Sequence, residues 1–270
     1  MSRAAPQEGT YERWAWDYIR TDELASKLAP TDPRGTAQWE RAAPVRRISA
    51  PGRPAELVVA ARAAKRPGSG SLQTARGRAQ LAHLCLHHEL QAAELFAWGL
   101  LAFPDAPPRF RRGLVGLVLE EARHARAYAG HVVRLGWGVG EFAVRDWLWQ
   151  RVSTCATPLA FVALLGLGFE GGNLEHALDF AARFRSAGDD GLADTAERVA
   201  REEVRHVRFA RVWYQRWHGE LEFERWRAEL PAPLTPTVLK GRPLARDLRR
   251  RAGLDDTFLE ALEAWAPPGS

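Results

Sequence analysis

The chain has 270 residues, 46% of them hydrophobic, which is enough for one large domain around its own core. No apolar run approaches the roughly 18 residues of a membrane span, and the first residues lack the hydrophobic segment of a signal peptide. Two widely separated cysteines, Cys85 and Cys155, argue against a disulfide framework and indicate a reducing compartment. These features predict a cytoplasmic protein with no membrane partner.

The net charge of +5 is carried almost entirely by arginine, which is typical of the Ala and Arg bias of a GC-rich genome. One cluster stands out near the C-terminus: Arg242, Arg246, Arg249, Arg250 and Arg251. We expect these arginines to form a solvated helix face that pairs with the acidic residues of the bundle. A nucleic acid partner is left open by this cluster but is not favoured.

The first part of the chain predicts an arm followed by two long helices. Residues 1–75 form the arm, with a short helix near 11–28 and then segments rich in Pro and Gly. One helix is expected over 75–103, where the Pro-rich stretch that follows ends it, and the next over 109–136, where glycines end it. The short connection between these two helices predicts an antiparallel pair.

The second part predicts another antiparallel pair. A helix is expected from about 158 to 186–191, and the next over 192–218. The link of about 20 residues that precedes this pair is long enough to cross a bundle. The predicted all-α fold therefore has an arm (1–75), a four-helix bundle with one long crossover (76–218), and a tail (219–270) that packs on the bundle and holds a last helix near 254–265.

One motif occurs twice. Glu-Glu-x-Arg-His stands at residues 120–124 and again at 202–206. On a helix, a Glu and a His three residues apart lie on the same face and point to one place in space. Two such pairs, with a further Glu from each of two other helices, form the ligand set of a di-metal carboxylate bundle.

The two further carboxylates stand at the matching places. Glu89 precedes Glu121 by 32 residues, and Glu170 precedes Glu203 by 33, so the chain consists of two copies of one helical hairpin. A single Glu-x-x-His is more often an exposed helix pair, but the repeat in both type and spacing favours a metal site. The predicted metal ligands are Glu89, Glu121, His124, Glu170, Glu203 and His206.

Helical periodicity places these carboxylates among apolar neighbours. Residues three, four and seven positions from Glu89, Glu121 and Glu203 are mostly Ala, Val and Leu. An ionised carboxylate there is costly unless it is paired or bound to metal, and two divalent ions balance four carboxylates. Alternative ligands at the two lone positions remain open: Glu94 in place of Glu89, and Glu175 or His176 in the third helix.

The four helices resemble the ligand helices of the ferritin-like superfamily, and the Glu-Glu-x-Arg-His form is closer to its dioxygen-activating branch than to the iron-storage ferritins. From about residue 14 to 262 the chain also resembles a bacterial ferritin-like family catalogued as a domain of unknown function. That resemblance lies in residues 88–95, 173–176 and 188–189. It implies the fold and the metal centre, and it brings no substrate.

This resemblance implies a role for each ligand. Glu121 and Glu203 would bridge two metal ions, each His would bind one ion, and Glu89 and Glu170 would be terminal. Oxygen-rich ligands with two imidazoles suit two Fe ions or a mixed Mn/Fe pair. The expected function is a dioxygen-activating oxidase or oxygenase that acts on a small organic substrate. Its electrons would come from an external donor, because no flavin or iron–sulfur motif is present.

Several neighbours of the ligands carry two interpretations. Glu120, Arg123, Glu202 and Arg205 either orient the ligands or form surface ion pairs. Tyr128 is expected in the core, and the residues that could line the cavity are His87, His88, Asn173 and His176. Four glycines around Glu170, at 166, 168, 171 and 172, indicate either close helix contact or a π-bulge that opens the helix beside the metals.

Three other functions are compatible with the sequence. Iron oxidation and storage would require assembly into a cage, and Phe96 stands where bacterioferritin-like proteins carry a Tyr, which weakens that interpretation. A tRNA-modifying hydroxylase would use the Arg-rich surface. A non-catalytic bundle would bind metal only for stability. The sequence does not predict the oligomeric state.

Overall fold

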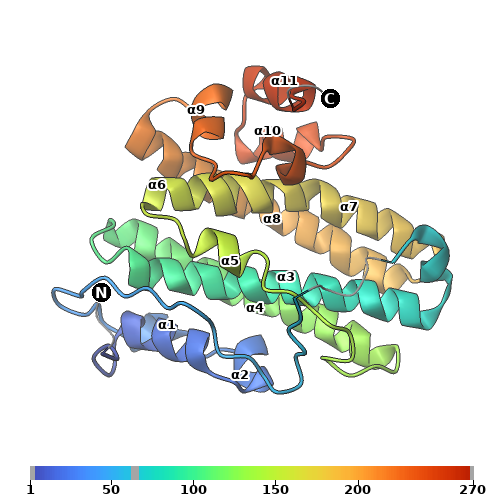
Figure 1. The fold of residues 1–270 in the computed structure, drawn as a ribbon, viewed down its shortest axis with the longest axis horizontal. Coiled ribbons are helices and arrows are strands. Elements are labelled where there is room, and N and C mark those ends of the chain that lie inside the picture. The colour runs from blue at the N-terminus through green and yellow to red at the C-terminus, as the bar shows by residue number, and fades with distance from the viewer. Residues whose placement is uncertain (1–3, 62–66, 268–270) are drawn as a thin grey trace. The chain divides into compact units, whose positions relative to one another are not determined.

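The structure is a computed structural model that describes residues 4–61 and 67–267 (Figure 1). Within these residues the regular elements are helices, and the only β-structure is two isolated bridges, which confirms the all-α class. No helix of the described part is long and apolar enough to span a membrane. The expectation about a signal peptide rests in part on residues 1–3, which lie outside this range. The chain divides into two compact units, residues 1–154 and 155–270.

The first unit is built on two long helices that pack side by side (Figure 1). Its elements are α1 (Tyr11–Arg20), α2 (Leu24–Leu28), η1 (Pro33–Gly35), η2 (Ser69–Gln73), α3 (Ala75–Ala102), α4 (Pro108–Arg134) and α5 (Trp149–Val152). α3 and α4 confirm the first predicted hairpin. Thr74 caps α3 by accepting a hydrogen bond from the Gly77 N–H at 3.1 Å, and Pro108 occupies the first position of α4, where its missing N–H costs nothing.

α3 is the central helix of this unit. Between Leu81 and Ala102 only Leu84 and His88 are not buried. A helix that is enclosed on all sides has no solvated face for its charged residues. The charge of each buried carboxylate on α3 must therefore be compensated by a partner inside the protein.

The N-terminal arm packs on this hairpin, with α1 against α3 and α2 against α4. The single helix expected near 11–28 is two helices. They separate after Arg20, where Thr21 accepts a hydrogen bond from the Glu23 N–H at 3.2 Å, a local bond that competes with the helical pattern. Two buried ion pairs fasten the arm: Lys27 with Glu94, at 2.6 Å between Nζ and Oε1, and Glu12 with Arg111.

The second unit repeats the hairpin design. Its elements are α6 (Pro158–Phe161), η3 (Val162–Phe169), α7 (Glu170–Ser186), α8 (Asp190–His218), α9 (Phe223–Ala228), η4 (Pro236–Leu239), α10 (Arg246–Ala252) and α11 (Asp256–Ala264). α7 and α8 lie side by side (Figure 1). Gly188 makes the turn between them with a φ of +75°, a value that favours glycine, and Asp189 then caps α8 through the Leu192 N–H at 3.2 Å.

Two parts of the second unit differ from the expected regular helices. The predicted helix from 158 contains an eight-residue π-helical segment, η3, which ends immediately before Glu170; the π-helical geometry that one interpretation of the glycines predicted is confirmed. The tail holds α9, η4 and α10 in addition to the predicted last helix, now α11. Trp226 of α9 is buried and donates from Nε1 to the Ala163 carbonyl at 2.9 Å, so this tail tryptophan serves packing, as expected.

A buried histidine in the first unit makes stability depend on pH. His83 Nε2 accepts a hydrogen bond from the Gly140 N–H at 2.8 Å, so the neutral ring carries its proton on Nδ1. Burial, together with the nearby His87, lowers the pKa of His83 from 6.5 to about 4. The unfolded chain therefore binds the proton more tightly than the folded protein does between these two values.

We expect the free energy of unfolding to fall as the pH drops from 6.5 towards 4, with His83 contributing about 3 kcal/mol of that loss. Replacing it in His83→Gln keeps an acceptor for Gly140 and removes the titration, so the variant should lose less stability over this range. Urea unfolding between pH 7 and 4.5 measures the difference. His218→Gln, at an exposed position on α8, is the control, and equal pH slopes for wild type and His83→Gln would contradict the assignment.

Candidate metal centre

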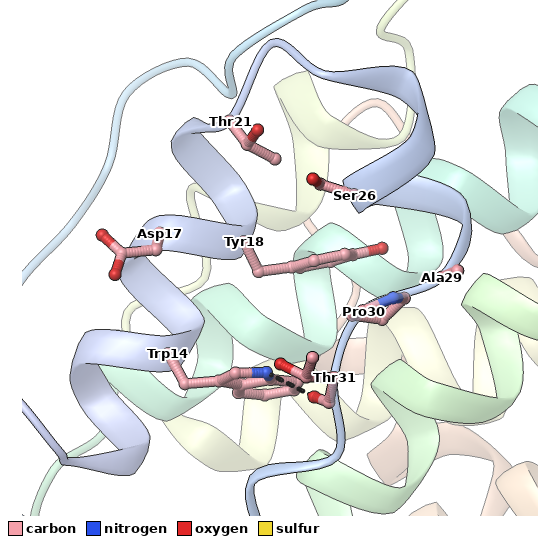
Figure 2. A pocket seen from close by; sticks show the side chains of 8 residues that line it. All are labelled: Trp14, Asp17, Tyr18, Thr21, Ser26, Ala29, Pro30 and Thr31. Atoms are coloured by element: carbon pink, nitrogen blue, oxygen red, sulfur yellow. Dashed lines mark hydrogen bonds between the residues drawn. The ribbon is translucent and has the colours of Figure 1, made fainter.

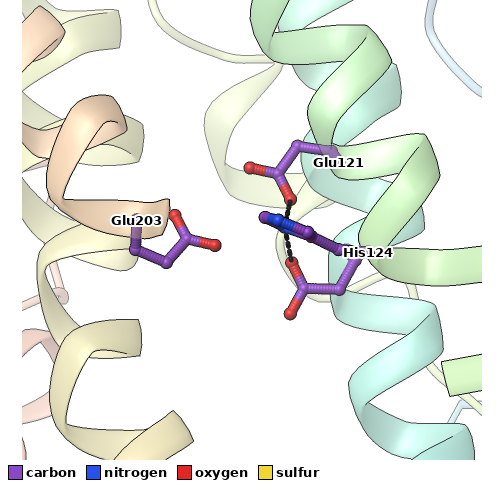
Figure 3. Close-up of side chains that lie close together, drawn as sticks. Glu121, His124 and Glu203 are labelled. Carbon is purple, nitrogen blue, oxygen red and sulfur yellow. Dashed lines mark ion pairs between the residues drawn. The ribbon is translucent and has the colours of Figure 1, made fainter. Parts of the chain in front are cut away.

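The first unit holds three of the predicted ligands together. Glu89 projects from α3, and Glu121 and His124 project from α4; all three are buried. His124 faces a carboxylate oxygen of Glu121 (Figure 3), and its Nδ1 lies 3.4 Å from that oxygen and 3.8 Å from a carboxylate oxygen of Glu89. Each residue offers a ligand atom within 4.8 Å of the other two. We call these residues the first triad.

The second unit holds the other three in the same way. Glu170 is the first residue of α7, and Glu203 and His206 project from α8; all three are buried. His206 Nδ1 lies 2.8 Å from a carboxylate oxygen of Glu203, and the ligand atoms of the three residues lie within 4.8 Å of one another. We call these residues the second triad. In both triads the imidazole turns Nδ1 towards its Glu-x-x-His carboxylate.

The donor set of each triad fits a divalent metal ion. Each triad contains two buried carboxylates and one imidazole. A protonated imidazole would neutralise only one of the two carboxylates, whereas one divalent cation neutralises both. Two oxygen donors and one nitrogen donor are ligands that Fe, Mn and Zn accept. The buried Glu and His groups are therefore able to hold metal, and their chemistry does not by itself select the ion.

The alternative ligands have other partners. Glu94 accepts from Lys27 and from Arg53, and its side chain is fully buried. Glu175 accepts from two nitrogens of the Arg249 guanidinium, Nε and a terminal nitrogen, at 2.8 and 2.7 Å. His176 is half-buried and stacks on a phenylalanine one turn away. The structure thus gives these three residues structural roles and brings Glu89 and Glu170 to the triads.

Comparison with known families adds one finding to this geometry. The model of DUF455, described as "Protein of unknown function", matches residues 9–260. The chain belongs to the DUF455 family. Comparisons with curated proteins and with solved structures gave no significant match. The matched range includes all six predicted ligands, so both triads lie in the part of the chain that the family model describes.

One further residue of this DUF455 chain bonds a predicted ligand directly. Asn173 lies one turn after Glu170 on α7 and donates from Nδ2 to Glu203 Oε1 at 3.3 Å. The other oxygen of Glu203 faces His206. An amide that holds one carboxylate oxygen restricts the rotation of the ligand and fixes the direction of the other. The sequence placed Asn173 only among residues that could line a cavity; its helical spacing of three from Glu170 was the available signal.

The remaining candidates are more peripheral. Glu120, Arg123 and Glu202 are half-buried, and Arg205 and His88 are exposed. Tyr128 is buried, as expected of a core residue. His87 is buried and lies 3.2 Å from Asp146, measured from Nε2 to Oδ1. Burial opposes ionisation of Asp146, but the hydrogen bond from His87 and the charge of Arg53 outweigh it and lower the pKa of Asp146 to about 2.

The Arg cluster near the C-terminus does not form a uniformly solvated face. Arg246 and Arg250 pair with acidic residues at the surface, at 2.7 Å to Glu263 and 2.8 Å to Asp256, but these partners belong to α11 in the tail and not to the bundle as expected. Arg249 is instead only 1% exposed, because α10 turns this side chain inward to Glu175. The expectation of a solvated face is therefore wrong for Arg249.

The first unit also has an open pocket of about 340 Å³ in its arm (Figure 2). Trp14 and Tyr18 line it with nearly parallel rings, 6.1 Å between centroids. Their polar atoms are engaged locally, since Trp14 Nε1 donates to the Thr31 carbonyl at 2.9 Å and the Tyr18 hydroxyl donates to the Lys27 carbonyl at 3.2 Å. Burial raises the pKa of Tyr18, and the charge of Glu94 adds to the rise. None of the six predicted ligands lines this pocket.

Loss of the Asn173 amide should weaken metal binding while the fold survives. We expect Asn173→Ala to lower the affinity for Fe(II) or Co(II) by about tenfold, because Glu203 loses the bond that orients it. Isothermal titration under anaerobic conditions measures the affinity. The matched control is Leu178→Ala, an exposed position on the same helix. Unchanged affinity in Asn173→Ala would contradict a supporting role.

Removal of the buried cation beside Glu94 should destabilise the first unit strongly. Lys27→Met leaves a fully buried carboxylate with one cationic partner fewer, so we expect a loss of about 3–5 kcal/mol in the free energy of unfolding. Lys27→Met combined with Glu94→Gln should recover part of that loss, because the charge that needs a partner is then gone. Urea unfolding of the two single variants and the double variant gives the coupling energy, and additive losses would contradict the assignment.

Proposed function

We propose that the two triads together form one dinuclear metal centre in a ferritin-like four-helix bundle. The bundle helices would be α3, α4, the helix that runs through η3 into α7, and α8. The observation that carries the proposal is the repeat: each unit brings one lone Glu and one Glu-x-x-His into a buried triad of the same composition. Four carboxylates and two imidazoles are the ligand set of the carboxylate bundles.

The connection between the units supports the same topology. Residues 135–157 join α4 to α6 and contain only the short α5. A bundle of two antiparallel hairpins needs one long crossover of this kind between its second and third helices. The arm (1–75) and tail (219–270) would then be additions to the central bundle (76–218).

We infer that the resident ions are two Fe, with a Mn/Fe pair as the alternative. Oxygen-rich ligation with one imidazole for each ion suits Fe and Mn, whereas thiolate-rich ligation would suit other metals. By resemblance to ferritin-like enzymes, Glu121 and Glu203 would bridge the ions, His124 and His206 would each bind one, and Glu89 and Glu170 would be terminal ligands. Asn173 holds Glu203 in position.

The function that this centre supports best is a dioxygen-activating oxidase or oxygenase acting on a small organic substrate. When bound, the two metal ions supply the electrons that reduce dioxygen, and an external donor restores them. The chain contributes ligand geometry and a dry apolar surrounding: every residue of η3 except Phe169 is buried, and η3 leads directly to Glu170. π-helical segments of this kind occur frequently at functional sites.

The other functions find less support. The surface arginines Arg246 and Arg250, which would serve a tRNA partner, are engaged with acidic residues of their own tail. Phe96, where a ferroxidase of the bacterioferritin type would carry a Tyr, is buried in the core. A non-catalytic metal-binding bundle would have the same triads and differs only in its reaction with oxygen.

An anaerobic Fe(II) titration of the metal-free protein tests the proposal. We expect about two irons per chain, and loss of stoichiometric binding in Glu121→Ala and in Glu203→Ala because each would remove a shared ligand. Asp194→Ala, at an exposed carboxylate on the same helix as Glu203, is the matched control and should bind iron as the wild type does.

The reaction with oxygen then separates catalysis from storage of metal. On mixing the ferrous protein with oxygen in a stopped-flow instrument, we expect rapid oxygen consumption and a transient visible absorption band. Absence of stoichiometric iron binding would contradict the proposal of a dinuclear centre. Stoichiometric binding without oxygen consumption would leave a non-catalytic metal-binding protein.

A further inference from the structure

A second repeat accompanies the metal triads. Five residues after the lone ligand Glu89 stands Glu94, and five residues after Glu170 stands Glu175. Five residues turn a helix by about 140°, so this second carboxylate points away from the triad on the same helix. Both are buried, and both are held by cations from outside the hairpin: Lys27 and Arg53 hold Glu94, and Arg249 holds Glu175.

The Glu175 pair is the more completely bonded of the two. Arg249 donates from Nε and from a terminal nitrogen to the two oxygens of Glu175, at 2.8 and 2.7 Å. The same oxygens accept from the backbone N–H of Ala245 at 2.9 Å and of Gly241 at 3.1 Å. Bidentate pairs with further hydrogen bonds are the buried ion pairs whose geometry offsets their desolvation.

Arg249 also bonds the helix backbone beside the metal ligand. Its terminal nitrogen donates to the Gly171 carbonyl at 2.8 Å. Gly171 directly follows Glu170, at the junction where the π-helical hydrogen bonds of η3 give way to those of α7. A carbonyl oxygen has two lone pairs, so the Gly171 oxygen can accept this outside donor in addition to a helical bond, and the contact ties the first turn of α7 to the guanidinium.

The glycines of this region serve the approach of the tail. A Cβ on Gly171 would lie 3.2 Å from a guanidinium nitrogen of Arg249, and a Cβ on Gly172 would lie 3.1 Å from the Leu239 carbonyl oxygen. In the tail, a Cβ on Gly241 would lie only 2.3 Å from the Cβ of Glu175. Side chains at these positions would hold the tail away from α7. Close contact thus accounts for Gly171 and Gly172, alongside the π-helical opening before them.

We propose that Arg249, held by Glu175, is a positioning residue for the metal ligand Glu170. By fixing the Gly171 carbonyl, it sets the direction in which Glu170 leaves the first turn of α7. The tail segment Leu239–Arg249 then helps to position a ligand of the proposed metal centre. This inference rests on the proposed function, because it assigns Glu170 as a ligand.

Two variants test the role of the guanidinium. Arg249→Met keeps most of the side-chain volume and removes all donors, and Arg249→Lys keeps the charge but loses the bidentate bond. Circular dichroism and thermal unfolding establish that each is folded, and Arg249→Lys carries the test if Arg249→Met does not fold. The control is Arg250→Met, at a neighbouring position on α10 whose side chain is 46% exposed.

The first measurement uses metal-free protein and so does not depend on the proposed function. Hydrogen exchange should become faster at the amides of the first turns of α7 in both Arg249 variants, with α3 and α4 unchanged. Equal protection at α7 in wild type and variants would overturn the inference that Arg249 holds the first turn of α7.

The second measurement uses Co(II) as the metal probe, because its visible spectrum reports ligand geometry. We expect Arg249→Met to bind Co(II) about 10- to 100-fold more weakly with an altered visible band, and Arg249→Lys to fall between it and the wild type. Wild-type affinity and spectrum in a folded Arg249 variant would overturn the positioning role. If the wild type itself binds no Co(II) or Fe(II), the proposed function fails, whereas the exchange result still decides whether Arg249 holds the helix.

Discussion

Buried carboxylates are the constraint on which this structure depends. The two hairpins place acidic side chains inside the protein, where an ionised group is stable only beside a compensating charge. The chain meets this requirement in two ways. Glu94 and Glu175 pair with cationic side chains from the arm and the tail, at 2.6 and 2.7 Å. The triad carboxylates instead face imidazoles, and the two carboxylates of each triad carry the negative charge that one divalent ion would balance. The first kind of site fixes the position of a segment, and the second is suited to a metal.

The arm and the tail therefore do more than cover apolar surface. Each sends a cation to the position five residues after the lone Glu of its own hairpin, and each cation is buried with its carboxylate. Loss of such a partner leaves a charge inside the protein, so these contacts are expected to be among the most sensitive to substitution. In the second unit the same contact reaches the backbone beside Glu170, which links the placement of the tail to the geometry of the proposed centre.

The π-helical segment and its glycines meet two physical demands at once. A π-turn widens the helix and changes the direction of the residues that follow it, at some cost in hydrogen-bond geometry. The glycines that follow allow the tail to approach to contact distance, and Arg249 of the tail donates to the Gly171 carbonyl. The tail thus contacts the helix directly after the π-helical segment, beside the predicted ligand Glu170.

The sequence by itself predicted the four long helices and the two Glu-x-x-His pairs, and it favoured Glu89 and Glu170 at the two lone positions without excluding their neighbours. Both follow from local rules. Capping residues, prolines and glycines indicate where a helix begins and ends, and a Glu and a His three residues apart share a helix face whatever surrounds them. Only the tertiary structure decided which of the nearby carboxylates are neutralised by cations. Lys27 is 67 residues from Glu94, and Arg249 is 74 residues from Glu175. No periodicity within a helix identifies such partners, and it was their arrival from the arm and the tail that gave Glu94, Glu175 and Arg249 their roles.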